Sequence, residues 1–300
     1  MSPYIGRFAP SPTGLLHLGS LFTALASFLE ARSRQGRWLI RIDDLDTPRN
    51  VCGANEAILS TLDVFGLHWD GSVTYQSQHQ QAYQQALQQL QDQHLLYRCT
   101  CSRKNLSDLD QSNPVSESIY PNICRDKNHP QTGEYALRLR TEPYLITFND
   151  GVQGVVSENL ASQHGDFILQ RKDRIIAYQL AVVVDDYLQG VNHTVRGADL
   201  LDATIKQIYL HQCLNLAMPH YLHVPVITGA QGAKLSKREF APAVNQQNSH
   251  LILFKLLVLL QQNPPSDLKH TSVAMQLDWA IQHWNPNALN LVRSIDITNP

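Results

Sequence analysis

A segment close to the start of the chain, GRFAPSPTGLLHLGSLFTAL from Gly6 to Leu25, constrains the fold more than any other stretch. It places two prolines and two glycines between a short apolar strand candidate and an amphipathic helix, predicted from about Ser20 to Arg34. The apolar segment RWLIRI at 37–42 then predicts a second strand. The order strand, turn, helix, strand is typical of a parallel sheet, so the sequence predicts an α/β fold.

The rest of the chain continues this alternation of helix and strand patterns. Helical spacing of apolar residues predicts helices at 53–66, 77–96 and 202–215. Strand patterns are found at 134–140, 166–171, 174–197 and 223–228. The densest apolar run, 251–260, is interrupted by Lys255 and is too short to span a bilayer, so it predicts a core helix.

One long region departs from this alternation. From Cys99 to about Pro130 the sequence is rich in Ser, Asn, Pro and Asp and has no clear periodicity. We therefore expect an α/β domain that is interrupted by an insertion and followed by a mostly helical region. The expected boundaries are 1–97 and 171–240 for the α/β domain, 98–170 for the insertion and 241–300 for the C-terminal region.

Composition limits the class of protein. The chain is 43% hydrophobic and 17% charged, as in ordinary globular proteins, and its net charge of -2 argues against a generally basic nucleic-acid coat. A local basic face remains compatible with that charge. No secretory signal, membrane span or obligate protein partner is expected. The five cysteines are an odd number, which favours a reducing cytoplasm and a metal site over a disulfide framework.

The first turn carries a candidate anion site. A helix that starts directly after a tight turn presents unpaired backbone N–H groups and the positive end of its dipole, which together hold phosphates. Gly14 and Gly19 permit close backbone approach, and Thr13, His17 and Ser20 can donate hydrogen bonds. The alternative is an ordinary strand-to-helix connection that is capped by Ser20.

A second phosphate motif lies late in the chain. The segment GAQGAKLSKREF at 229–240 has small residues that lead into Lys234, Lys237 and Arg238. A flexible loop that ends in paired lysines can close on a polyphosphate and stabilise the charge that develops as it is cleaved. Taken alone, the segment also fits a solvated basic loop.

In this order and at this separation, the two motifs resemble the signatures of class I aminoacyl-tRNA synthetases. HLGS at 17–20 stands where that family has a HIGH-type sequence, and KLSKR at 234–238 where it has KMSKS. The segments RFAPSPTGLLHLG and RIDDLD resemble the glutamyl branch. The resemblance implies a Rossmann-like parallel-sheet catalytic domain with a small zinc-bearing insertion and a short, mostly helical C-terminal region.

The short segment after Lys237 resembles the glutamyl-Q tRNA(Asp) synthetase family, because it leaves no room for a large anticodon-binding region. The resemblance implies an ATP-dependent, tRNA-independent activation of L-glutamate to glutamyl-adenylate. Glutamate is then transferred to queuosine at the wobble position of tRNA(Asp). Transfer to a different acceptor and a catalytically silent glutamate- or RNA-binding module are the alternatives.

The resemblance also implies roles for individual residues. Catalysis is assigned to His17, Ser20 and Lys237, and ATP with Mg²⁺ to Thr13, His17, Gly19, Lys234, Ser236 and Lys237. Glutamate is assigned to Arg7, Ala9, Ser11, Asp43, Tyr178 and Arg196. Guanidinium groups bind carboxylates bidentately, which suits Arg7 and Arg196 to an acidic substrate. Asp43 stands where the family usually has Glu, and Val182 where full-length relatives commonly have Asn, so the pocket has altered ligands.

The cysteine-containing segment predicts a structural zinc site. Thiolates bind Zn²⁺ well and a structural site takes four ligands, so Cys99, Cys101 and Cys124 leave one position open. His129 is the chemical first choice for it, whereas the family resemblance implies Tyr120. The alternative is three thiols without a metal. We expect a local group of basic residues to contact RNA. The alternative is that they are ordinary solvent-exposed side chains. These residues are Arg171, Lys172, Arg174 and Arg238.

Overall fold

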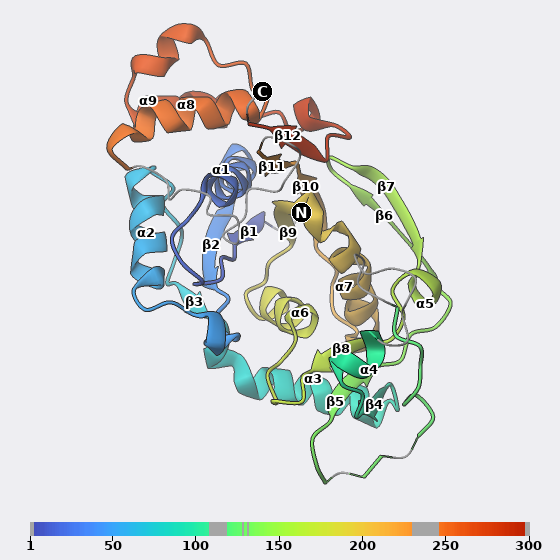
Figure 1. The fold of residues 1–300 in the computed structure, drawn as a ribbon. Helices are drawn as coiled ribbons and strands as arrows, with labels where there is room; N and C mark the ends of the chain where they lie inside the picture. The colour runs from blue at the N-terminus through green and yellow to red at the C-terminus, as the bar shows by residue number, and fades with distance from the viewer. Residues whose placement is uncertain (1–2, 108–118, 128, 131, 230–245, 298–300) are drawn as a thin grey trace.

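The computed structural model describes residues 3–107, 119–127, 129–130, 132–229 and 246–297 (Figure 1). The N-terminal part forms the predicted parallel sheet. Strand β1 (Ile5–Phe8) pairs in parallel with β2 (Arg37–Ile42), and β2 pairs in parallel with β3 (Thr74–Tyr75). The helix between the first two strands is α1 (Leu18–Ser33), so the predicted strand, turn, helix and strand are confirmed.

Two further parallel pairs continue this architecture. β9 (His193–Gly197) pairs with β10 (His220–Val224), and β11 (Val226–Thr228) pairs with β12 (Ser294–Asp296). β1 lies beside β9, so the ends of these two strands meet at the start of α1. The predicted strand 223–228 is divided at Pro225, which has no N–H to donate to a strand ladder.

The main core surrounds α1. This helix is apolar along most of its length, and its buried side chains include Phe22, Leu25 and Leu29. Trp38 on β2 is fully buried against it, with its ring edge-on to Phe28. Burial of this kind, at about 25 cal/mol per Å² of apolar surface, supplies most of the free energy of folding.

Three of the other helices, α2 (Ala54–Val64), α3 (Gln80–Asp92) and α7 (Leu201–Leu214), were predicted from the pattern of the sequence. α8 (Ser249–Leu259) was predicted from its apolar run, and α9 (Val273–His283) only as part of a mostly helical C-terminal region. α3 ends before the predicted limit of 96, because His94 takes a left-handed conformation with φ 59° that stops the helix. α9 packs against both α1 and α8, and α8 and α9 lie at one end of the molecule (Figure 1). Among the described residues, no helix has the length and apolar content needed to cross a membrane.

Antiparallel strands occupy the segment that we propose as an insertion. β5 (Ala136–Leu139) lies between β4 (Leu96–Cys99) and β8 (Phe167–Gln170). A hairpin of β6 (Leu145–Asp150) and β7 (Gly154–Asn159) lies alongside β10. Two short helices, α4 (Arg103–Ser107) and α5 (Leu160–Gln163), complete this region. Figure 1 shows β4, β5 and α4 at the end of the molecule opposite α8 and α9.

The prediction of strand structure for residues 174–197 is wrong in the central part of that segment. Residues Tyr178–Leu188 form helix α6, and only His193–Gly197 form a strand. The difference in helix propensity between valine and the best helix formers is below about 1 kcal/mol per residue, and tertiary burial outweighs it. Every residue from Leu180 to Asp186 is buried. The helix also turns Asp185 and Asp186 toward buried arginine and tyrosine partners, which an alternating strand cannot do for adjacent residues.

Candidate active site

A cavity of about 380 Å³ lies where β1 and β9 end and α1 and α6 begin. Most of the residues assigned to glutamate, ATP and catalysis line it: Arg7, Ala9, Ser11, Thr13, His17, Gly19, Ser20, Tyr178 and Arg196. Asp43 is not among the lining residues. The remaining assigned residues, Lys234, Ser236 and Lys237, lie outside the described part of the chain, as does Arg238.

The turn before α1 ends in a histidine cap. The backbone N–H of Ser20 donates to His17 Nδ1 at 3.2 Å, so His17 rather than Ser20 caps the helix. Because Nδ1 accepts this bond, the proton of the neutral ring is on Nε2, which donates to Ser20 Oγ at 2.9 Å. Gly14 has a φ of 132°, which L side chains rarely adopt. The imidazole and the hydroxyl are thus held together at the positive end of the helix.

Arg7 reaches the cavity from β1 and is held by a carboxylate of α6. Its Nε and Nη2 donate to the two oxygens of Asp186 at 3.0 and 3.2 Å, and both side chains are buried. Burial alone raises the pKa of Asp186, but the charges of Arg7 and Arg41 outweigh it and lower that pKa to about 2. The sequence analysis missed Asp186, although two acidic residues at the end of the apolar run VVVDD were a signal for buried partners.

Asp43 takes part in a buried charge cluster that is centred on Arg41. Arg41 Nε donates to Asp43 at 2.7 Å and Nη1 donates to Asp186 at 2.6 Å, while Asp185 lies 3.7 Å from Nε. Burial raises the pKa of Asp43 to about 6 even though Arg41 opposes the shift. The carboxylate of Asp43 therefore binds a protein cation here, and its contact with a substrate ammonium stays a prediction.

Two of the three guanidinium nitrogens of Arg196 donate to neighbouring side chains. Its Nε donates to His223 Nε2 at 3.0 Å and its Nη2 donates to Thr204 Oγ1 at 2.7 Å. Its Nη1 is buried and has no hydrogen-bond partner among the residues that the structure describes. A buried guanidinium donor without an acceptor costs free energy, which a carboxylate in the cavity would recover.

A carboxylate and an imidazole fix the orientation of Arg196. His223 is fully buried, and its Nδ1 lies 2.6 Å from Asp150 Oδ2. The other oxygen, Oδ1, accepts the backbone N–H groups of Val152, Gln153 and His223. Burial lowers the pKa of His223, so the ring is neutral, donates from Nδ1 and accepts from Arg196 at Nε2. Sequence analysis missed this chain of contacts, which joins β6, β10 and β9.

Tyr178 enters the cavity at the first residue of α6. Its side chain is 39% exposed, in contrast to the buried apolar face of that helix. Val182, one turn further along, is 2% exposed and belongs to the packed interior. An open aromatic face at the rim of a cavity suits contact with a ligand.

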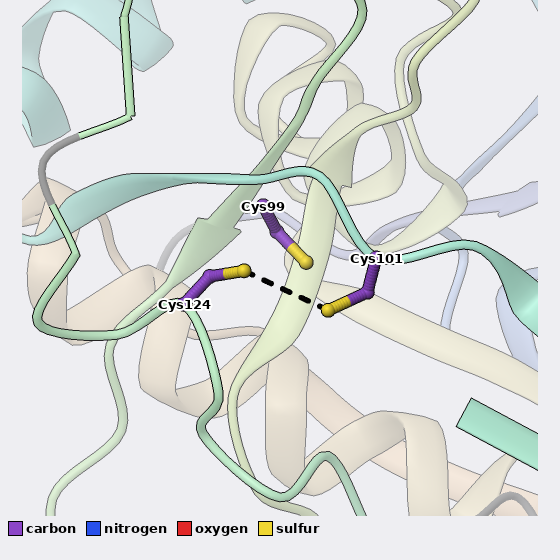
Figure 2. A group of neighbouring side chains, drawn as sticks. All are labelled: Cys99, Cys101 and Cys124. Atoms are coloured by element: carbon purple, nitrogen blue, oxygen red, sulfur yellow. Dashed lines mark hydrogen bonds between the residues drawn. The ribbon is translucent and has the colours of Figure 1, made fainter. Parts of the chain in front are cut away.

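The three predicted thiols meet in space (Figure 2). The sulfurs of Cys99, Cys101 and Cys124 all lie within 4.8 Å of one another, and those of Cys101 and Cys124 are 3.6 Å apart. Tetrahedral zinc with Zn–S bonds of about 2.3 Å sets its sulfurs roughly 3.8 Å apart, so the spacing fits this metal. The Tyr120 hydroxyl lies 3.4 Å from the Cys99 sulfur and 3.6 Å from the Cys101 sulfur. His129 stands outside the group of three thiols, but its side chain is hydrogen-bonded to the Cys124 thiol.

The thiols of this cluster differ in acidity, since burial raises the pKa of Cys101 while that of Cys124 is lowered. Burial alone raises the pKa of the Cys124 thiol, but hydrogen bonds from the Tyr120 hydroxyl and the Thr100 backbone lower it to about 6. Burial raises the pKa of Tyr120, whose hydroxyl therefore stays protonated without a metal. A bound dication favours the ionised form of both side chains.

The predicted RNA-contact residues lie on the segment that joins β8 to α6. Arg171 pairs with Asp173 at 2.7 Å, and Lys172 donates to the carbonyl of Thr100 at 2.7 Å. The guanidinium of Arg174 lies 4.4 Å from the centre of the Tyr135 ring. This basic segment ends shortly before Tyr178, at the rim of the cavity.

Known proteins resemble this chain along nearly its full length. The model of the family described as "tRNA synthetases class I (E and Q), catalytic domain" matches residues 5–252. Relatives named glutamyl-Q tRNA(Asp) synthetase from Pseudomonas paraeruginosa and Pseudomonas entomophila are 46% and 45% identical to it. The first alignment covers 95% of this chain and 94% of the relative, and the second covers 99% and 97%.

A solved structure supports the fold independently. The glutamate tRNA ligase of Elizabethkingia meningosepticum superimposes with a TM-score of 0.82 at 22% identity, over 99% of this chain and 67% of that one. At this identity the likeness concerns the fold alone, a Rossmann-like parallel sheet with helices. The residues matched by the family model and the alignments with the two relatives lead to one assignment. The chain belongs to the glutamyl-Q tRNA(Asp) synthetases, a branch of the class I tRNA synthetases of the E and Q group, and thus to the ATP-dependent ligases.

Proposed function

We propose that this protein activates L-glutamate with ATP to form glutamyl-adenylate, without needing tRNA, and transfers the glutamate to queuosine at the wobble position of tRNA(Asp). The observation that carries the glutamate assignment is the buried Nη1 of Arg196, which has no hydrogen-bond acceptor within the described part of the chain. A side-chain carboxylate supplies the missing acceptor. The name of the two relatives, glutamyl-Q tRNA(Asp) synthetase, supports the choice of tRNA(Asp) and queuosine.

The same arginine accounts for selection of glutamate over glutamine. An amide offers one acceptor oxygen and no negative charge, so it leaves the buried cation without its counter-charge. By analogy with truncated buried charge pairs, this loss is about 2–5 kcal/mol, or roughly 30- to 5000-fold in kcat/KM. Discrimination of that size needs no separate editing site.

Activation relies on positioning and charge stabilisation. The α-carboxylate of glutamate attacks the α-phosphate of ATP in line, and pyrophosphate leaves, so no protein nucleophile is required. The N-terminus of α1 directs backbone N–H groups at the phosphates, and His17 and Ser20 add hydrogen bonds from the same turn. Lys234, Ser236 and Lys237 contact the leaving pyrophosphate. A queuosine hydroxyl then attacks the activated carbonyl and loses its proton, the bond between the carbonyl carbon and the phosphate oxygen breaks, and AMP leaves.

A zinc ion held by Cys99, Cys101, Cys124 and Tyr120 has a structural role in this proposal. The three cysteines come from two segments that are distant in the sequence, the end of β4 and the turn around 120–124. The described residues around the cluster include few large apolar side chains, so a metal adds stability that packing alone does not supply.

The test is glutamate-dependent exchange of labelled pyrophosphate into ATP in the absence of tRNA. Exchange with glutamate and not with glutamine is expected, and no exchange would refute tRNA-independent activation. Labelled glutamate is then offered with tRNA(Asp) that carries queuosine and with unmodified tRNA(Asp). Labelling of the modified tRNA alone is expected. Equal labelling of both refutes the queuosine assignment, and labelling of neither points to another acceptor.

A further inference from the structure

A second cavity, of about 410 Å³, lies in the antiparallel region beside β4 and β5. Its lining is basic, in contrast to the net charge of -2 of the whole chain. Four cationic side chains face a single carboxylate, that of Asp126; the cations are Arg98, Arg125, Lys127 and Arg140. An excess of positive charge around a hollow is the arrangement that binds phosphate groups.

The neighbouring carboxylates neutralise only part of this charge. Arg125 is paired with Asp166 at 3.1 Å and with Glu142 at 2.9 Å. Among the described carboxylates, Arg140 pairs with Asp126 alone, at 3.3 Å, and the side chain of Asp126 is 90% exposed, so water and salt screen that pair.

Two cations of the lining have no acidic partner. Within the described part of the chain, no carboxylate oxygen lies within 4.0 Å of the charged nitrogens of Arg98 or Lys127. Arg98 Nη1 donates to the carbonyl of His129 at 3.2 Å, but Arg98 Nε is buried and finds no acceptor in the described part of the chain. The cavity therefore combines unbalanced positive charge with a donor that lacks an acceptor, which an anionic oxygen satisfies.

An aromatic contact connects the cavity to the basic segment before α6. The ring of Tyr135 is close to two guanidinium groups, 5.3 Å from that of Arg98 and 4.4 Å from that of Arg174. From Arg174 the chain runs through Ile175 and Ile176 to Tyr178, which lines the first cavity. A row of cations separated by an aromatic ring suits a ribose-phosphate chain better than a single small anion.

We propose that the second cavity binds a phosphodiester group of the RNA that receives the glutamate. This proposal rests on the proposed function for the identity of the RNA, and the ligand chemistry is a phosphate group. Free pyrophosphate also offers phosphate oxygens, but it is too small to contact the cations outside the cavity, such as Arg174, at the same time. Because Arg98 precedes Cys99 and Lys127 follows Cys124, the cysteine cluster joins the two walls of the cavity and keeps them at the right separation.

The test compares RNA binding by the variants Lys127→Ala and Arg98→Gln with RNA binding by the wild-type protein. The probe is tRNA(Asp) carrying queuosine, and its dissociation constant is measured at several salt concentrations. Each variant is expected to weaken binding roughly tenfold at low salt and to reduce the slope of log K against log salt by about 0.7–1, as for one lost phosphate contact. The matched control is Lys269→Ala, an exposed lysine of the C-terminal region that should leave both quantities unchanged.

Unchanged affinity and unchanged salt slope in both variants overturn the proposal. Melting temperature detects a folding defect in Arg98→Gln. Lys127→Ala keeps the test decisive because Lys127 is exposed and its side chain pairs with no carboxylate among the described residues. Binding of inorganic pyrophosphate is measured in parallel. If Lys127→Ala loses pyrophosphate and keeps RNA, the cavity serves a free anion and the RNA proposal is wrong. The proposed function fails by a different measurement. In that case the wild-type protein shows no glutamate-dependent pyrophosphate exchange without tRNA, whatever the RNA affinity of the variants is.

Discussion

Replacing Asp150 by Asn tests the orientation of Arg196 without touching the cavity. In the structure, Asp150 Oδ1 accepts three backbone N–H groups and Oδ2 faces Nδ1 of His223. An asparagine must keep its oxygen on the three backbone donors, so its NH₂ group faces the imidazole. The ring of His223 then has to accept at Nδ1 and carry its proton on Nε2, where it meets the Nε–H of Arg196.

The expected magnitude follows from that contact. Arg196 loses a hydrogen bond from a charged donor, which contributes about 1.5–3 kcal/mol, so KM for glutamate should rise roughly 10- to 150-fold. kcat should change much less, because neither Asp150 nor His223 lines the cavity. The assay is glutamate-dependent pyrophosphate exchange with both constants determined.

The matched control is Asp166→Asn. Asp166 is equally buried and accepts the backbone N–H and the hydroxyl of Thr141, but it lies in the antiparallel region and does not contact Arg196. This control should lower the melting temperature and leave KM for glutamate unchanged. A KM within twofold of wild type in the Asp150 variant, or an equal rise in KM in the control, would refute the reasoning.

Three further outcomes are expected. Cys124→Ser should abolish zinc binding as measured by metal analysis and lower the melting temperature, whereas Cys213→Ser, outside the cluster, should keep the metal. Asp186→Asn should reduce the free energy of unfolding in urea by about 3–5 kcal/mol, because it leaves buried arginines without their shared anion. The protein should lose stability as pH falls below about 6.5, since burial lowers the pKa of His211 to about 4 and also lowers that of His223, so the unfolded chain takes up protons that the folded one excludes. Asp43, whose pKa is raised to about 6, opposes this trend, and thermal melting between pH 7 and pH 4 measures the net effect.

Local patterns were sufficient for much of the fold. The prolines and glycines of the first turn, with apolar segments on both sides, predicted a parallel strand–helix–strand unit that the structure contains. Spacing predicted α3, which presents one apolar face of Tyr83, Ala86, Leu87 and Leu90 to the core, while α1 is buried almost all round. The segment 174–197 was misread because a run of valines reads as a strand, while the two aspartates that determine its burial have partners far away in the sequence.

The site was predictable only where it follows a local motif. His17, Ser20 and the cysteines stand in short recognisable segments, and the structure brings each group together. Asp150 and His223 stand 73 positions apart and meet only because the β6–β7 hairpin lies beside β10, which no local pattern reveals. The position of Asp43 also depends on tertiary contacts, since Arg41 is close enough to bind its carboxylate.

The charge cluster around Arg41 has a consequence for how this family can diverge. Arg41 meets Asp43, Asp185 and Asp186, and Asp186 also holds Arg7. Removing one member leaves an uncompensated ion in the interior, while exchanging the whole set for apolar side chains of similar volume is often nearly neutral. These positions should therefore be inherited together or replaced together, and a lineage that has lost Arg41 should have lost its aspartates as well.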